Sequence, residues 1–286
     1  MKVLVTEAIS EHGLDILRQA APVDVRLGLN GAELVAAIQD YSVLVVRSAT
    51  QARLHYVADS AFAPYGERSD EEIRDRSRRV VEHLLAQGAR LIVVACNTAT
   101  AAAIDALRRE HAGTPFVGVE PGVRPAIALS RRKRIAVMAT EATLRSERFR
   151  VLVQREAAGG FVHLQPCPGL AAAIERDDVD SPELQALVTR YAGAVRAADV
   201  DVVALGCTHY PFVRRDIARV LGDEVMLLDT ADAVASQAAR LWRAPAIEVE
   251  AAWCQLETTG DPQQLQRFAA RWLDIGVTVA STALAF

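Results

Sequence analysis

Residues 91–100 read Leu-Ile-Val-Val-Ala-Cys-Asn-Thr-Ala-Thr, and residues 201–211 read Asp-Val-Val-Ala-Leu-Gly-Cys-Thr-His-Tyr-Pro. In each stretch a β-branched apolar run, typical of a buried strand, leads through a small residue to a cysteine, Cys96 or Cys207. Polar residues and a helical stretch follow both cysteines. Each thiol should therefore lie at the carboxyl end of a parallel strand, where open α/β sheets bind ligands. Because backbone amides at a helix start lower the pKa of a nearby thiol, we expect both cysteines to form thiolates.

The rest of the chain repeats this alternation of short apolar runs and longer helical stretches. That pattern is typical of parallel sheets covered by helices on both faces. One helix is predicted from Asp70 to about Gln87, with Ser69 as its N-cap and Gly88 as its stop. Strands are predicted for residues 2–6, 23–26, 42–46, 54–58, 91–95, 116–119, 134–138, 161–165, 202–205, 224–228 and 253–257.

Composition narrows the class of protein. The 286 residues are 51% hydrophobic, and 32 Lys and Arg against 36 Asp and Glu give a net charge of −4. A chain this apolar folds around a core, and a slightly acidic one offers no broad electrostatic attraction for nucleic acid or an anionic membrane. Neither a bilayer-spanning run of about 18 apolar residues nor a signal-peptide pattern is seen. We expect a cytoplasmic protein with a small-molecule substrate.

The four cysteines differ in their surroundings. Cys167 and Cys254 lie in stretches that favour a structural role, and no CxxC or His-pair spacing predicts a metal site. Cys96 and Cys207 form a matched pair instead. Two bases on opposite faces of a planar carbanion can remove a proton from one side of a carbon and return one to the other. The pair therefore predicts racemisation or epimerisation.

From about Leu54 to Leu273 the chain resembles glutamate racemase, in the aspartate/glutamate racemase superfamily. The resemblance rests on residues 95–100 and 206–211, and on Pro64-Tyr65-Gly66, 118–122, 139–143 and 258–260. It implies that Cys96 and Cys207 are the acid and base thiols, that His209 assists Cys207, and that Glu175 is a further acidic candidate beside it. The substrate-binding positions that it implies are Asp59, Pro64, Tyr65, Gly66, Asn97, Thr98, Thr140, Thr143 and Thr208.

The resemblance also implies a fold and a role. The fold class is α/β, with two pseudo-symmetric, doubly wound, parallel-sheet domains of flavodoxin-like type and the active site in the cleft between them. Residues 1–125 with 231–286 would form the first domain and residues 126–230 the second. The reaction would interconvert L- and D-glutamate without a cofactor or metal and supply D-glutamate for peptidoglycan. A homodimer is compatible with the family.

The first 51 residues depart from that family. They resemble the start of D-3-phosphoglycerate dehydrogenase and lack the Asp-Ser-Gly turn that supports the first cysteine in racemases. Either residues 3–6 take the missing strand position, with Glu7 in place of the Asp, or residues 42–46 do, which brings Arg47 and Ser48 to the site. The short link between residues 46 and 54 predicts an antiparallel pair or a spliced junction.

This departure leaves two alternatives to glutamate racemisation. One is a related superfamily activity such as aspartate racemisation, and the other is a chimeric chain that keeps the racemase fold without catalysis. Losing a proton-transfer helper costs about 10²–10⁴-fold in rate. A measurement of racemisation with each amino acid therefore decides between these alternatives.

Overall fold

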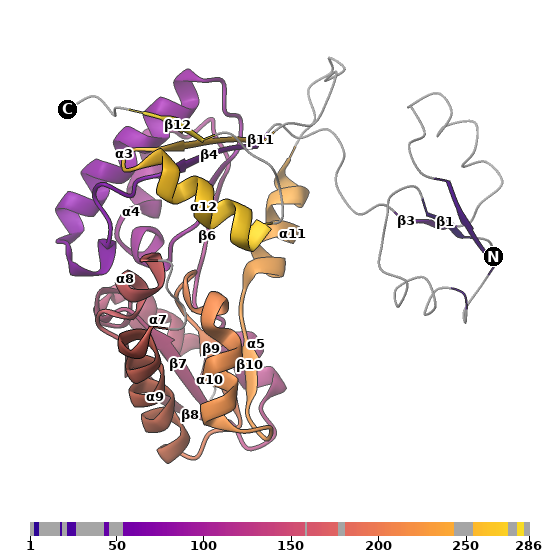
Figure 1. The fold of residues 1–286 in the computed structure, drawn as a ribbon, viewed down its shortest axis with the longest axis vertical. Coiled ribbons are helices and arrows are strands. Elements are labelled where there is room, and N and C mark those ends of the chain that lie inside the picture. Colours follow the sequence, from indigo (N-terminus) through magenta and orange to yellow (C-terminus); the bar gives the residue numbers. More distant parts are fainter. Residues whose placement is uncertain are drawn as a thin grey trace. The chain divides into compact units, whose positions relative to one another are not determined.

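The computed structural model describes residues 3–5, 18, 22–26, 43–45, 54–157, 159–176, 181–242, 254–273 and 279–282. The chain forms two compact units, residues 1–52 with 244–252 and residues 53–243 with 253–286. Strands in both units are parallel, as the sequence predicts (Figure 1). No helix within the described ranges has the length and apolar character needed to cross a bilayer.

The smaller unit contains one three-stranded sheet of order β2-β1-β3. Strand β1 (Val3–Val5) pairs in parallel with β2 (Val23–Val25) on one side and with β3 (Val43–Val45) on the other. Neither placement of these strands among the racemase strands is found in the described residues, because this sheet contains β1, β2 and β3 and no strand of the larger unit. An antiparallel pairing of residues 42–46 with 54–58 is also wrong, since β3 and β4 (Leu54–Ala58) lie in different sheets and β4 pairs in parallel with β11 (Cys254–Thr258). Glu7, Arg47 and Ser48 lie outside the described residues.

The larger unit contains three parallel sheets, of orders β10-β9-β7-β8, β12-β11-β4 and β5-β6. The described strands expected in the first domain thus lie in three separate sheets, one of them in the smaller unit, whereas those of the second domain form one. The domain bounds 1–125 with 231–286, and 126–230, stay a prediction. The remaining strands are β5 (Ile92–Val94), β6 (Phe116–Gly118), β7 (Arg134–Ala139), β8 (Phe161–Pro166), β9 (Val202–Leu205), β10 (Met226–Leu228) and β12 (Val279–Ser281).

Helices follow most strands. Helix α3 (Asp70–Ala86) begins where the sequence predicts, because the Ser69 side chain accepts from the Glu72 amide while the Glu72 carboxylate accepts from the Ser69 amide. Gly88, with a φ of 86°, follows its end as predicted. The other helices are α4 (Asn97–Glu110), α5 (Val123–Leu129), α6 (Glu141–Arg145), α7 (Glu147–Glu156), α8 (Leu170–Glu175), α9 (Pro182–Ala197), α10 (Arg214–Leu221), α11 (Ala231–Leu241) and α12 (Pro262–Leu273), with 3₁₀ helices η1 (Tyr65–Glu67) and η2 (Tyr210–Val213).

The four-stranded sheet is buried on both faces. Successive residues of β7 and β9 point to opposite sides, so each strand contributes to two cores. One core lies against α8, α9, η2 and α10, and the other against α5 and α7. The continuous apolar runs of these strands reflect this double burial. The first core takes Ala136, Met138, Val203 and Leu205 from the sheet, and the second takes Ile135, Val137, Ala139, Val202 and Ala204.

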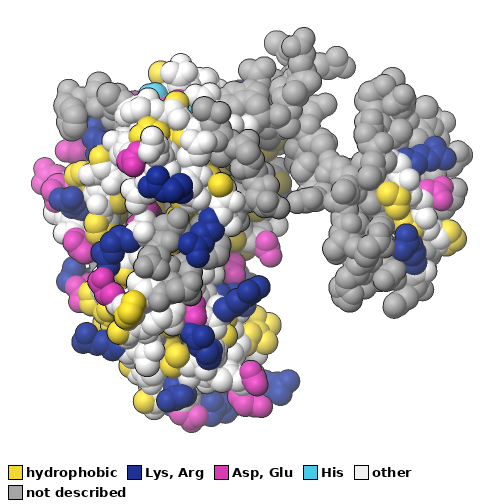
Figure 2. Space-filling model, in the orientation of Figure 1, with side chains coloured by type: hydrophobic (Ala, Val, Ile, Leu, Met, Phe, Trp, Pro, Cys, Tyr) yellow, Lys and Arg dark blue, Asp and Glu magenta, His cyan; other side chains and the backbone are white. Residues whose placement is uncertain are grey.

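The eleven predicted strands all occur: β7 and β8 are one residue longer than expected, β4 and β9 match, and β5, β6 and β10 are one or two residues shorter. Strand β12 was missed, because its three residues lie in a small-residue stretch with little β-propensity. On the face of the larger unit in view, Lys and Arg side chains are interspersed with Asp and Glu in the described part (Figure 2). That distribution agrees with the near-neutral charge of the chain.

A buried ion pair joins the end of β4 to α3. Both Asp59 oxygens accept from the Arg76 guanidinium, at 2.8 and 2.7 Å, and the two side chains are 7% and 10% exposed. Asp59 also accepts from the Tyr65 hydroxyl at 2.7 Å and from the Thr259 hydroxyl at 2.8 Å. Burial alone raises the pKa of Asp59, but the hydrogen bonds from Arg76, Tyr65 and Thr259 bring it below its ordinary value. The carboxylate thus links β4, η1, α3 and the turn after β11.

Replacing Arg76 by Met should lower the free energy of unfolding by about 3–5 kcal/mol, because the buried Asp59 carboxylate loses its counter-ion. Urea unfolding at neutral pH measures the change. Arg74→Met, on the same helix, is the control and should have a much smaller effect. Because the folded-state pKa of Asp59 is lowered, the contribution is present above pH of about 3.9 and fades as the pH falls through the lower folded-state value. Equal losses in both variants would contradict the prediction.

Candidate active site

Cys96 lies just past β5, at the start of α4. It is the N-cap residue of that helix, and its sulfur accepts from the Ala99 amide at 3.4 Å. Burial raises the pKa of the Cys96 thiol to about 11, and the neighbouring Cys207 adds to the rise against hydrogen bonds from Ala99 and Thr98. The expectation of a lowered pKa at Cys96 is therefore wrong, because burial outweighs the helix amides. Cys96 is a protonated thiol at neutral pH.

Cys207 follows β9 through Gly206 and is 8% exposed. The close approach of β7 explains the glycine, since an added Cβ would lie 3.1 Å from the Met138 carbonyl oxygen. The Cys207 sulfur lies 3.7 Å from Nδ1 of His209. This separation places the imidazole within reach of a proton exchange with the thiol.

His209 connects Cys207 to Glu175, the last residue of α8. Its Nε2 lies 2.5 Å from a Glu175 carboxylate oxygen. Burial lowers the pKa of His209, but the hydrogen bonds and charges of Cys207 and Glu175 outweigh it and raise the pKa to about 10. The backbone of Glu175 is held in turn, because its carbonyl accepts from the Gln264 side chain at 2.9 Å. His209 is therefore an imidazolium at neutral pH.

The two cysteine-bearing segments lie next to each other. The Thr208 hydroxyl, which follows Cys207, donates to the carbonyl of Ala95, which precedes Cys96, at 3.3 Å. The electrostatic influence of Cys207 on Cys96 agrees with this proximity. The two similar strand–cysteine segments, residues 91–100 and 201–211, thus bring both thiols into one region of the larger unit.

Three threonine hydroxyls form a closed cluster beside Cys96. Thr98 lies 2.9 Å from Thr140 and 3.1 Å from Thr143, and Thr140 lies 3.0 Å from Thr143, each distance joining hydroxyl oxygens. Gly66 packs on this cluster, since a Cβ added to it would lie 3.1 Å from the Thr140 Cβ. The predicted residues Gly66, Thr98, Thr140 and Thr143 therefore meet, although they come from three separate segments.

The other predicted residues surround this cluster or support it. Asn97 is buried and donates to the Val119 carbonyl at 3.4 Å. Pro64 precedes η1, whose Tyr65 hydroxyl is engaged by Asp59. Because Arg76, Tyr65 and Thr259 occupy both Asp59 oxygens, the structure gives Asp59 the geometry of a positioning group. Burial and the Asp59 charge raise the pKa of Tyr65.

Sequence analysis missed two residues near the site. Arg76 is a charged residue at a core-facing position of α3, in line with Ile73 and Ser77, and that position could have indicated a buried ion pair. Burial raises the pKa of Tyr56, and the charges of Glu175 and Cys96 add to the rise. Tyr56 therefore lies near both halves of the site, but no local pattern in β4 indicates it.

A small hollow is lined by Asn97, Thr143 and Arg148, among others, and by neither cysteine. It shares Asn97 and Thr143 with the candidate site.

Comparisons with known proteins agree with the thiol pair. A sequence model of the Asp/Glu/Hydantoin racemase family matches residues 33–238. Glutamate racemase from Pseudomonas aeruginosa PAO1 is 44% identical over 216 residues, which cover 75% of this chain and 82% of that protein. Glutamate racemase from Ralstonia pickettii is 42% identical over 259 residues, covering 90% of this chain and 89% of its own length.

Solved structures give the same fold. The glutamate racemase isoform RacE1 of Bacillus anthracis matches with a TM-score of 0.71 and 26% identity, over 99% of this chain and 97% of that one. Escherichia coli glutamate racemase, solved with L-glutamate and the activator UDP-MurNAc-Ala, matches with a TM-score of 0.72, over 100% of this chain and 99% of that one. At 23% identity the second likeness shows the fold alone.

The comparisons also bear on the first 51 residues. None supports a phosphoglycerate dehydrogenase segment there, and the racemase family model begins inside that segment, at residue 33. The alignment that covers 90% of the chain also includes some of these residues. The resemblance therefore extends further toward the amino terminus than residue 54, and the chain belongs to the Asp/Glu/hydantoin racemase family as a glutamate racemase, an amino-acid isomerase.

Proposed function

We propose that this glutamate racemase moves the α-proton of glutamate between two thiols, Cys207 and Cys96, without a cofactor. The Thr208–Ala95 hydrogen bond carries this proposal, because it sets the two cysteine-bearing segments side by side. Two acid/base groups on opposite sides of one carbon are what inversion of a stereocentre requires.

The two thiols begin the reaction in different states. A Cys96 pKa of about 11 makes this residue the proton donor at neutral pH. In one direction the Cys207 thiolate takes the proton from Cα, and the Cys96 thiol delivers its proton to the opposite face of the resulting carbanion. The turnover leaves a thiol at Cys207 and a thiolate at Cys96, so the reverse reaction starts from that arrangement.

His209 and Glu175 serve Cys207 in this scheme. The imidazolium, 3.7 Å from the sulfur, can exchange a proton with Cys207 and offset the negative charge of its thiolate. Glu175 holds the ring in place and keeps it protonated. Both residues therefore place and hold a positive charge beside the Cys207 sulfur.

Neutral groups would hold the substrate. We assign the carboxylate and ammonium of glutamate to the hydroxyls and amides of Asn97, Thr98 and Thr208 and to the Pro64–Gly66 segment, with Thr140 and Thr143 lining the second half of the site. Hydroxyls that already bond one another are fixed in position before substrate arrives, which lowers the cost of binding. Asp59 acts through Tyr65 as a positioning residue.

The wider role follows from the reaction. D-glutamate made here would be supplied to peptidoglycan synthesis. A cytoplasmic location, a homodimer and an acidic support for Cys96 from Glu7 stay predictions.

Deuterium uptake at Cα of L-glutamate in heavy water, followed by NMR together with optical inversion, tests the proposal. The wild-type chain should exchange and racemise glutamate. Cys96→Ser and Cys207→Ser should each lose about 10²–10⁴-fold in the rate of inversion, because one face of the carbon loses its acid or base.

Cys254→Ser is the matched control, since Cys254 lies in β11 away from the two thiols, and it should keep the wild-type rate. Exchange with aspartate but not glutamate would replace the proposed substrate. A cooperatively folded chain without exchange on either amino acid would show that the fold is retained without catalysis.

Glu175→Gln should lower the pKa of His209 below its value of about 10, because the carboxylate that favours the imidazolium is removed. The alkaline limb of the rate profile should then move to lower pH. Histidine ring NMR and the pH dependence of inversion both report the change. Glu183→Gln, which removes an exposed partner of Arg176, is the control. An unchanged His209 titration would contradict the assignment.

A further inference from the structure

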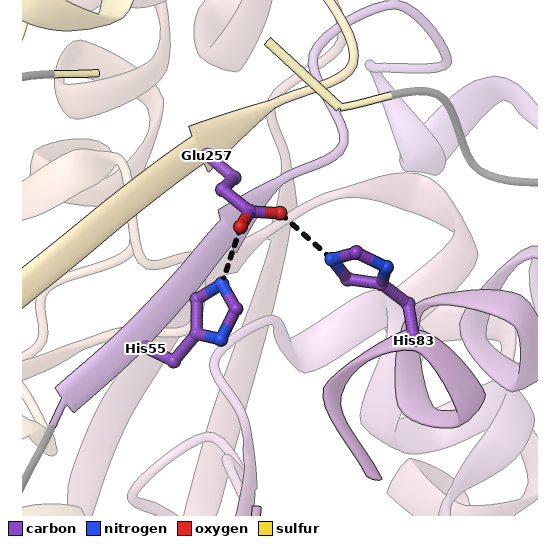
Figure 3. A group of neighbouring side chains, drawn as sticks. All are labelled: His55, His83 and Glu257. Atoms are coloured by element: carbon purple, nitrogen blue, oxygen red, sulfur yellow. Dashed lines mark hydrogen bonds and ion pairs between the residues drawn. The ribbon is translucent and has the colours of Figure 1, made fainter. Parts of the chain in front are cut away.

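Three potential metal-binding side chains converge at the interface between α3 and the β12-β11-β4 sheet, apart from the thiol site. His55 lies in the middle of β4, His83 near the end of α3, and Glu257 in β11 (Figure 3). His55 Nε2 is 2.9 Å from one Glu257 oxygen, and His83 Nε2 is 2.7 Å from the other. One ligand atom from each residue lies within 4.8 Å of the other two.

Strand register brings the two sheet residues to one face. His55 is paired with Gln255 across the parallel β4–β11 ladder, and Glu257 lies two residues beyond Gln255. Because side chains alternate along a strand, His55, Gln255 and Glu257 all point toward the same side. Helix α3 covers that side and contributes His83. The side chains are 11%, 9% and 22% exposed for His55, Glu257 and His83.

The donor set is one that transition metals prefer. Two imidazole nitrogens and a carboxylate oxygen suit Zn²⁺, which binds such atoms at about 2.0–2.2 Å and takes a water as its fourth ligand. Tetrahedral ligands at that distance lie about 3.4 Å apart. The three donor atoms lie within 4.8 Å of one another, and the two hydrogen-bonded pairs are 2.7 and 2.9 Å apart, so each pair needs to change its separation by no more than about 1.4 Å.

The surroundings prepare these groups for a cation. The Glu257 carboxylate, 9% exposed, faces one imidazole with each of its oxygens. Gln255 donates to one Glu257 oxygen at 2.6 Å, which fixes the carboxylate from outside the cluster.

We propose that His55, His83 and Glu257 bind one divalent transition-metal ion of the zinc class. The site is structural, because the ligands lie within β4, α3 and β11, whereas the two thiols lie beyond the carboxyl ends of β5 and β9. A bound ion would clamp strand β11 to the β4–α3 segment. Sequence analysis expected no metal because three distant segments supply the ligands.

Cobalt and zinc binding to the full chain tests this inference. After treatment with a chelator, wild type should bind one equivalent of Co²⁺ with the visible absorption of a tetrahedral site, and Zn²⁺ should displace it and raise the melting temperature. His83→Gln should bind at least about 10–100-fold more weakly and lose the thermal shift. His83 is on the helix surface, so this variant should still fold, which circular dichroism checks.

His163→Gln is the matched control, because His163 lies in β8 near Gln165 and outside the cluster, and it should bind like wild type. X-ray absorption of the zinc-loaded wild type gives an independent readout, with nitrogen and oxygen neighbours expected. Sulfur neighbours would assign the ion to the cysteines and overturn the proposal. Absence of stoichiometric binding, or equal affinity in wild type and His83→Gln, would overturn it as well.

Discussion

The buried carboxylate of Asp59 is the constraint on which the larger unit depends. A charge that is 7% exposed must be paired, and four hydrogen bonds from Arg76, Tyr65 and Thr259 pair it. These bonds fix the path of the chain from β4 through η1 to α3. The same path carries Gly66 onto the threonine cluster. A structural ion pair therefore determines where the substrate-binding segment lies.

The two cysteines show how similar sequences acquire different chemistry. Both follow a buried strand, yet only Cys207 has an imidazole beside its sulfur. Burial without such a partner leaves Cys96 protonated. A reaction that inverts a stereocentre needs one acid and one base at any moment. The two similar strand–cysteine segments thus give their sulfurs different neighbours.

Features that depend on residues close together in the sequence are predictable from it, whereas features that depend on contacts between distant residues are not. Strands, the α3 cap and the strand–cysteine motifs are local patterns, and the structure contains them. The raised pKa of Cys96 was not predictable, because the neighbours that bury it come from elsewhere in the chain. The pairing of Arg76 with Asp59 likewise joins a helix to a strand end. Separation of the first-domain strands into three sheets is a further long-range outcome that periodicity alone does not determine.

The division into short sheets leaves open strand edges. Within the described residues β4 is the last strand of its sheet, and β5 pairs only with β6. Leu54 and Tyr56, on one side of β4, are 59% and 43% exposed. Unpaired amides and carbonyls beside apolar side chains invite a strand from another molecule. Self-association through this strand edge would rise with protein concentration. Dilute solutions, at a pH where the chain carries a net charge, therefore favour the monomer.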